Sequence, residues 1–580
     1  MLDPINRDVE TGIQSLIDVD EMDAHLDVFD NLARVSGTED EWEASEYVVE
    51  KLEAYGVDAE ILEFEALIST PEEAGITVTS PEKRNIDEAI TTSFGASTPP
   101  SGVDGEVVHV PELTEESLAA EDVEGKLVFT RGLPTPEPIT NLEAAGAAGV
   151  VFESLGGEHL HEMIVTPIWG TPSHEDADQI PDLPVVEVTS ADGEWLREKV
   201  TEGPVEATIR TQVTIGLTTL PCPVGRIEGT KSDRYMLMGN HVDSWYEGVT
   251  DNATAMATTM EVARVIAEAD EDPHRGLVFG FWPAHSTGRY AGSAWYADEE
   301  WLDLNENGVC YLHVDLNGLK GADSIWFQHM AELADEHLDA IESATDLPLR
   351  DDDESWLGSS GRPARNSDQS FWGAGLSSLL SGARLDPATD EGGPIGGGWW
   401  WHTPEDTRDK VDMDVLVEET QLYVALAARF GYSPVLPHDY TATVKDIRTV
   451  LSDIESFAGQ EFEEIHSILN ELEAVIIDAN ELINNHAESD PNLAADAEDL
   501  QVQLGNLLVP TLYMETEEYG HDPALPHQRL PYLRLAEELP ELSGRERRFA
   551  ETSVRRGRNR VVHRVGKAVK AARRFVDKYA

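Results

Sequence analysis

Cysteine is almost missing from this sequence. Its 580 residues include two, Cys222 and Cys310, which rules out a disulfide framework and makes a cysteine metal cluster implausible. Long apolar runs are missing too, since no stretch approaches the roughly 18 apolar residues of a membrane-spanning helix. The start, MLDPINRDVETGIQSL, lacks the basic residues and apolar core of a secretory signal. We therefore expect a soluble, cytoplasmic protein.

Positive charge is scarce as well. There are 41 Lys and Arg against 112 Asp and Glu, for a net charge of −71. This excess goes beyond what solubility needs, and it suits a solvent of molar salt, where the Debye length falls to about 3 Å. We expect a salt-adapted protein from a halophilic archaeon, with a merely acidic protein as the alternative. The net charge is therefore evidence about the solvent in which the protein works, and it says little about the substrate.

The few basic residues gather at the C-terminal end. From Ser543 onward there are 13 Lys and Arg and 3 Asp and Glu. Such a segment could be a nucleic-acid or membrane arm. On so acidic a chain we favour a helix docked on the chain's own acidic surface or on a partner subunit, and we expect no nucleic acid and no membrane as partners. Residues 436–515 before it carry apolar positions at helical spacing, which favours a helix-bundle core.

Periodicity changes along the chain and predicts four domains. Residues 8–55 have helical spacing and end at Gly56, a residue typical of helix ends. Residues 73–215 are rich in short β-type runs, and residues 216–435 alternate strands with helices, including helices at 252–268 and 291–305. We therefore predict an α/β fold, a sheet flanked by helices. The domain ranges would be 1–72, 73–215, 216–435 and 436–580.

Histidines and aspartates stand where several of these strands end. In HVDSWYEGVTDN, His241 leaves a strand, Asp243 can orient an imidazole, and Asp251 opens a helix with two oxygens that can bridge two cations. Asp315 ends the apolar strand of CYLHVDLNG, and His402 lies in a Gly- and Trp-rich loop. Open α/β sheets bind ligands at the edge where the carboxyl ends of their strands lie. The set suits one or two divalent metals, zinc above all.

The order of these motifs carries a resemblance to a known family. GNHVDSW, GVTDNATAMATTMEVARVI, GLVFGFWPA, YLHVDLNG and WWWHTPEDTRDKVD follow one another as in the co-catalytic zinc aminopeptidase and glutamate carboxypeptidase family, to which the transferrin receptor is related. The resemblance implies a zinc-exopeptidase-like mixed sheet, a protease-associated domain inserted at 96–215, and a helical dimerisation domain at 436–540. It also implies a homodimer that acts on a peptide or small amide substrate.

The resemblance assigns roles to the site residues. His241 and Asp315 would bind one metal, His402 would bind the second, and Asp251 would bridge the two. In that family a glutamate deprotonates the water that attacks the scissile carbonyl. The family pattern Trp-x-Ala-Glu-Glu-x-Gly reads WPAHSTG here, which puts His285 in the place of the base and Ser286 in the place of a ligand.

This departure leaves several interpretations of His285. A neutral imidazole can accept a proton from a metal-bound water, or it can bind the metal itself. Both His285 and Ser286 could also be ordinary loop residues. Three functions follow: a metallopeptidase with an altered base, a non-catalytic metal-binding or receptor-like dimer, or a metalloenzyme of another reaction type.

Other residues near these motifs have weaker claims. Trp245, Tyr246 and the tryptophans at 399–401 could line a substrate pocket or could simply pack around the site. Arg365 could meet a substrate carboxylate.

Overall fold

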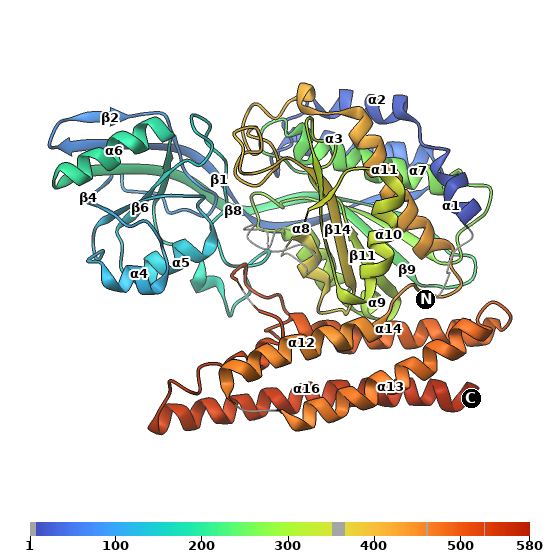
Figure 1. Cartoon of the computed structure of the whole chain (residues 1–580). Helices are drawn as coiled ribbons and strands as arrows, with labels where there is room; N and C mark the ends of the chain where they lie inside the picture. Colours follow the sequence, from blue (N-terminus) through green and yellow to red (C-terminus); the bar gives the residue numbers. More distant parts are fainter. Residues whose placement is uncertain (1–6, 351–365, 460–461, 527) are drawn as a thin grey trace.

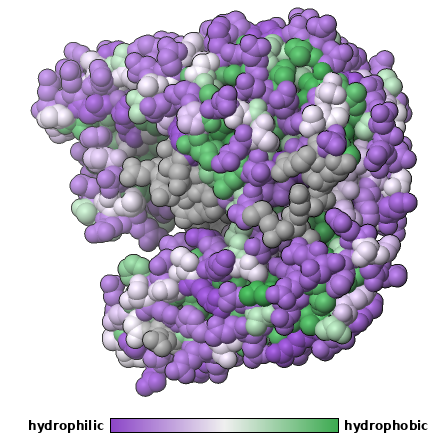
Figure 2. Space-filling model, turned by 45° about the vertical axis from the view of Figure 1, so that its right-hand side comes forward, coloured by the Kyte–Doolittle hydropathy of each residue, from purple (hydrophilic) through white to green (hydrophobic). Residues whose placement is uncertain are grey.

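The computed structural model describes residues 7–350, 366–459, 462–526 and 528–580. Figure 1 shows three parts: an α/β body, a β-rich part to one side that two long strands connect to the body, and a layer of long helices beneath the body. The face drawn in Figure 2 is largely hydrophilic, as the composition leads one to expect.

A mixed sheet forms the centre of the body. Its strands lie in the order β13-β12-β14-β11-β9-β10-β8, and β14, β11, β9 and β10 are mutually parallel. β12 is antiparallel to β14 and parallel to β13, and β8 is antiparallel to β10. The predicted α/β fold with a mixed sheet is thus confirmed. The strand bounds are β9 Tyr235–His241, β10 Gly276–Trp282, β11 Gly308–His313, β12 Ser324–His329, β13 Leu349–Arg350 and β14 Ser377–Arg384.

Helices cover both faces of this sheet because alternate strand residues are apolar on both sides. Met236 and Met238 of β9 pack with α2, α3, α7 and α11, whereas Tyr235 and Leu237 pack with α8 and α9. The helices of the body are α1 Arg7–Gln14, α2 Val19–Phe29, α3 Glu39–Ala54, α7 Thr254–Ala267, α8 Ala291–Glu299, α9 Trp301–Asn307, α10 Ala334–Ala344 and α11 Met413–Tyr432.

Local sequence signals predicted one helix end correctly and missed a break between two helices. Gly56 follows α3 with φ of +87°, a left-handed conformation that favours glycine, so the predicted helix stop is confirmed. The prediction of a single helix at 291–305 is wrong. The chain forms α8 and α9 instead, because Glu300 between them leaves helical geometry with φ −101° and ψ 17°.

The β-rich part is attached by two very long strands. β1 Asp58–Ser80 and β8 Val205–Ile227 pair antiparallel over most of their length and run from the body into this part. The sheet continues from β8 through β4-β5-β6-β7-β3. The predicted boundaries at 72/73 and 215/216 fall inside the two long strands and stay a prediction. The other elements are β2 Arg84–Ile86, β3 Ala89–Ile90, β4 Val103–His109, β5 Leu127–Arg131, β6 Gly149–Glu153, β7 Val185–Val188, α4 Glu115–Ala120, α5 Pro136–Ala144 and α6 Ser190–Glu202.

The C-terminal part is helical, and its basic helix docks on acidic neighbours. α16 Gly544–Tyr579 packs along α13 Glu463–His486 and α14 Pro491–Tyr513 with one apolar stripe. Its cations pair with their carboxylates in Arg558–Glu464, Arg573–Glu471 and Lys578–Asp496. The expectation of a helix on the chain's own acidic surface is confirmed. The remaining helices are α12 Tyr440–Ala458 and α15 Pro531–Arg534. Within the described ranges, none of the helices combines the length and apolar character that crossing a bilayer takes.

A buried ion pair joins this helical part to the body. Arg275 is fully buried at the start of the body's β10, and its Nε donates to Glu498 Oε1 of α14 at 2.6 Å. Ser232 also donates to Glu498, at 2.7 Å. Arg234 adds a longer contact to Glu498 at 3.4 Å. Because Arg275 and Glu498 are both out of water, Arg275 depends on this carboxylate for its charge balance.

We expect Arg275→Ala to destabilise the protein, because the substitution leaves the buried Glu498 carboxylate with a single, more distant cation, Arg234 at 3.4 Å, at a cost of up to about 3–5 kcal/mol. Thermal unfolding should show a midpoint lowered by up to about 2–4 °C, because the unfolding entropy of a chain of this length is about 1.2 kcal/mol/K. The matched control is Arg448→Ala, whose partly exposed pair with Glu473 at 2.7 Å is worth about 1 kcal/mol or less. Equal shifts for the two variants would contradict this account.

Candidate metal centre

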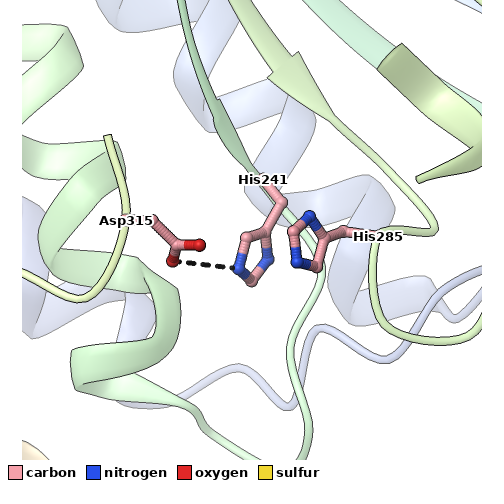
Figure 3. A group of neighbouring side chains, drawn as sticks. All are labelled: His241, His285 and Asp315. Atoms are coloured by element: carbon pink, nitrogen blue, oxygen red, sulfur yellow. Dashed lines mark ion pairs between the residues drawn. The ribbon is translucent and has the colours of Figure 1, made fainter. Parts of the chain in front are cut away.

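The predicted site residues meet at the carboxyl edge of the sheet. His241 is the last residue of β9, His285 lies three residues beyond β10, and Asp315 lies two residues beyond β11. Asp251 belongs to the turn Val249–Ala253 that leads into α7, and His402 belongs to the loop before α11. Because parallel strands end at a common edge, residues far apart in sequence come together there. Figure 3 shows three of them, with His241 between Asp315 and His285.

The hydrogen bonding of His241 fixes which nitrogen faces the carboxylates. Its Nδ1 donates to the backbone carbonyl of Asp243 at 2.7 Å. The Nε2 lone pair therefore faces two acceptors, Asp251 Oδ1 at 3.0 Å and Asp315 Oδ1 at 3.6 Å. Burial alone would lower the pKa of His241, but the two carboxylates raise it well above its usual value. A cation, either a proton or a metal, is needed among these three groups.

His402 repeats this arrangement on the other oxygen of Asp251. Its Nδ1 donates to the carbonyl of Glu162 at 2.5 Å, and its Nε2 lies 3.1 Å from Asp251 Oδ2. Burial works to raise the pKa of Asp251, but the two imidazoles outweigh it and hold that pKa below its usual value. Each oxygen of Asp251 therefore faces the Nε2 of a different histidine, the arrangement of a carboxylate that bridges two cations.

The donor set fits zinc. Zinc bonds to nitrogen and oxygen of about 2.0–2.2 Å in tetrahedral geometry separate neighbouring ligand atoms by about 3.4 Å. The separations from Asp251 and Asp315 to His241 and His402, 3.0 to 3.6 Å, bracket that value. Asp315 Oδ1 is also buried without a hydrogen bond among the described residues, a costly state that a cation would relieve.

His285 lies directly against this cluster. Its ring stacks on that of His241, with 4.0 Å between centroids and 16° between planes, and one ligand atom each from His241, His285 and Asp315 lie within 4.8 Å of one another. Burial, together with the neighbouring His241, holds the pKa of His285 well below its usual value. His285 therefore lies beside the centre in surroundings that disfavour its protonated form.

The Asp243 carboxylate has another role than the one expected from the sequence. The backbone carbonyl of Asp243, and not its side chain, accepts the hydrogen bond of His241. Asp243 Oδ1 accepts the backbone N–H of His285 and Oδ2 that of Ser286, both at 2.9 Å. The expectation that this carboxylate orients an imidazole is wrong, because it anchors the turn that carries His285 and Ser286.

Several supporting residues escaped the sequence analysis. Asp406 accepts hydrogen bonds from the backbone N–H groups of Thr250 and Asp251, both at 2.9 Å, and burial raises its pKa to about 7. It lies inside the motif WWWHTPEDTRDKVD, so it could have been found. Arg34 is fully buried and donates to the carbonyls of Val242 and Gly248, at 3.0 and 2.9 Å. No local pattern marks Arg34, or the contact of Glu162 with His402.

The tryptophans of the site frame His402. Trp401 stacks on its ring at 3.7 Å between centroids, and Trp245 meets it edge-on at 6.2 Å. Trp400 is buried and donates from Nε1 to the hydroxyl of Thr250 at 3.0 Å. Packing around the site accounts for Trp400 and Trp401. Arg365 lies outside the described residues.

Comparisons with known proteins find similar sequences among peptidases. Residues 224–427 match the model of Peptidase family M28. The probable lipoprotein aminopeptidase LpqL of Mycobacterium tuberculosis is 25% identical over 329 residues, which are 54% of this chain and 62% of that protein. The probable glutamate carboxypeptidase AMP1 of Arabidopsis thaliana is 23% identical over 344 residues, 48% of this chain and 49% of the plant protein. The chain thus spans less than two thirds of both relatives.

Solved structures show the same fold. The aminopeptidase from Aneurinibacillus sp. strain AM-1 superposes with a TM-score of 0.56 at 20% identity, over 73% of this chain and 96% of that one. A zinc aminopeptidase from Bacillus subtilis gives 0.54 at 20% identity, over 72% and 96%. Residues 224–427, the range that is similar to the Peptidase family M28 model, include His241, Asp251, His285, Asp315 and His402.

Proposed function

We propose that this protein is a metal-dependent peptidase that hydrolyses peptide or small amide bonds and uses one or two divalent metal ions, zinc first among them. The observation that carries the proposal is the Asp251 carboxylate, whose two oxygens face the Nε2 atoms of His241 and His402 at 3.0 and 3.1 Å. The match of residues 224–427 to a peptidase family supports the same reaction class. LpqL and AMP1 differ in the chain end that their names imply, so the proposal covers both aminopeptidase and carboxypeptidase or dipeptidase action.

In this proposal the residues of the site have three roles: binding metal, accepting a proton and positioning the proton acceptor. His241 and Asp315 would hold one metal, His402 would hold a second, and Asp251 would be shared between them. When bound, a divalent metal supplies Lewis acidity toward water and the substrate carbonyl. His285 accepts the proton of the attacking water, because its ring stacks on that of His241 at 4.0 Å and so lies beside the residues that would hold the metal. The Asp243 carboxylate keeps His285 at that place, because its Oδ1 accepts the backbone N–H of His285 at 2.9 Å.

Two alternatives remain distinct from this proposal. A receptor-like or otherwise non-catalytic homologue would bind metal and leave peptides intact. A metalloenzyme of another reaction type would use the same residues for a different substrate. Metal-dependent turnover of a panel of aminoacyl and dipeptide substrates separates the proposed peptidase from both.

We expect His241→Ala and His402→Ala each to lower metal content and melting temperature together, because a ligand that binds only the native state stabilises it by RT ln(1 + [L]/Kd). Elemental analysis and thermal unfolding with and without added zinc check this. His174→Ala, an exposed histidine of the β-rich part, is the matched control and should change neither quantity. Full metal content and unchanged melting in both site variants would overturn the assignment.

For His285 we expect His285→Ala to retain the metals and to lose a factor on the order of 10²–10⁴ in kcat, as removal of a general base does. Metal analysis alongside kinetics checks the role, because a drop in metal content would show a ligand instead of a base. The double variant His285→Glu with Ser286→Glu restores the family pattern and should keep or raise peptidase activity. If this variant binds metal but leaves peptides intact, the centre serves another reaction.

We further propose a homodimer formed through residues 436–540, a protease-associated-like domain at 73–215, and, from the net charge of −71, adaptation to molar salt. The resemblance of these two regions to known domains supports the first two proposals. Light scattering in molar salt should give twice the mass of one chain. The mass of a single chain across micromolar concentrations would contradict the dimer.

A further inference from the structure

We infer that Trp169, which the β-rich part contributes, positions His285 by way of Tyr290. This inference rests on the proposed role of His285 in the reaction. It concerns a segment far from the metal ligands in sequence, residues 161–170, all of which are buried.

The segment 161–170 is built into the site. Glu162 donates its backbone N–H to the carbonyl of His402 at 3.0 Å, and its own carbonyl accepts from His402 Nδ1 at 2.5 Å. His161 Nδ1 bonds to the carbonyl of Trp401 at 2.6 Å. One end of the segment is therefore fixed to the loop that holds a predicted metal ligand.

The other end of the segment supports the turn that carries His285. Arg289 and Tyr290, which follow His285, both have positive φ, 48° and 64°. Two successive non-glycine residues in this region are strained and need restraint from their surroundings. The segment supplies it. The N–H of Gly170 donates to the carbonyl of Arg289 at 2.7 Å, and the Arg289 guanidinium donates to the carbonyl of Ile164 at 2.8 Å.

Aromatic contacts extend this support to the imidazole itself. Trp169 stacks on Tyr290 with 4.1 Å between centroids and 21° between planes, and Tyr290 meets the ring of His285 edge-on at 4.4 Å and 82°. These are the offset-stacked and T-shaped geometries that aromatic pairs prefer. His285 is thus held between His241 on one face and Tyr290 on another side.

Trp169 cannot move away from Tyr290, because its other end is also fixed. Its Nε1 donates to the hydroxyl of Ser370 at 2.9 Å, and Ser370 in turn contacts the hydroxyl of Ser293 at 2.9 Å. Trp169 is 5% exposed. Removing the indole would leave space beside Tyr290, into which its ring could turn, and His285 would lose the contact that limits its orientation.

The test compares Trp169→Leu with Trp195→Leu in the full chain. Trp195 is a half-buried tryptophan of the same β-rich part that stacks with Arg84, away from the site. Because small misplacements of reacting groups are costly, we expect Trp169→Leu to lower kcat on the order of ten- to a hundredfold. KM should stay within about twofold, since substrate contacts are unchanged. Trp195→Leu should change neither, and Trp169→Phe, which keeps an aromatic face toward Tyr290, should restore most of kcat.

Two further readouts separate positioning from a loss of folding. In the background of Tyr290→Leu, Trp169→Leu should have little further effect on kcat, because both act on His285 along one path. In metal-free protein labelled at histidine, the ring-proton shift of His285, identified from its loss in His285→Ala, should move in Trp169→Leu and not in Trp195→Leu.

The inference is overturned if the His285 shift stays unchanged in Trp169→Leu, or if the two tryptophan variants lose kcat equally. It is also overturned if the effects of Trp169→Leu and Tyr290→Leu simply add. If the wild-type protein hydrolyses no peptide, the proposed function fails, and the chemical shifts still decide whether Trp169 positions His285.

Discussion

The site depends on one electrostatic constraint, a buried aspartate whose two oxygens each face the lone pair of an imidazole. Asp251 lies 3.0 Å from His241 Nε2 and 3.1 Å from His402 Nε2, and both histidines have their Nδ1 hydrogens committed to backbone carbonyls. Such an arrangement repels itself unless cations lie in it. The chemistry of the centre follows from that need for positive charge.

Much of the surrounding structure serves to hold this arrangement in place. The carboxylate of Asp406 fixes the backbone of Thr250 and Asp251, and buried Arg34 ties down the carbonyls of the loop that joins His241 to Asp251. The Asp243 carboxylate fixes the turn of His285. In each case a charged side chain is buried against backbone groups, which is costly without full hydrogen bonding and therefore specifies one conformation.

The fold and the core of the site could be predicted because the signals are local. Strands and helices alternate visibly after residue 216, and a histidine or aspartate at the end of an apolar strand has few structural reasons to be there. His241 and Asp315 could be predicted in that way, whereas Asp251, at the start of a helix, and His402, in a Gly- and Trp-rich loop, depended on the order of the motifs. The fold brings all four to one sheet edge. The break between α8 and α9 was missed because it depends on the conformation of Glu300, to which no glycine or proline points.

Contacts between distant segments could not be predicted in this way. Glu162 and Trp169 belong to the β-rich part, which the long paired strands β1 and β8 connect to the body. Both residues contact the site from there. No pattern near residues 161–170 marks them as neighbours of His402 or Tyr290. The role of the Asp243 carboxylate was misjudged for a related reason, because spacing shows that two groups are near and does not show which atoms bond.

Anomalous diffraction at the zinc absorption edge, from crystals of the wild-type protein grown with zinc, tests the central claim most directly. The account predicts anomalous density beside Asp251, between its carboxylate and Nε2 of His241 or His402. Ordered side chains with no anomalous density there, or zinc bound only elsewhere on the acidic surface, would contradict it.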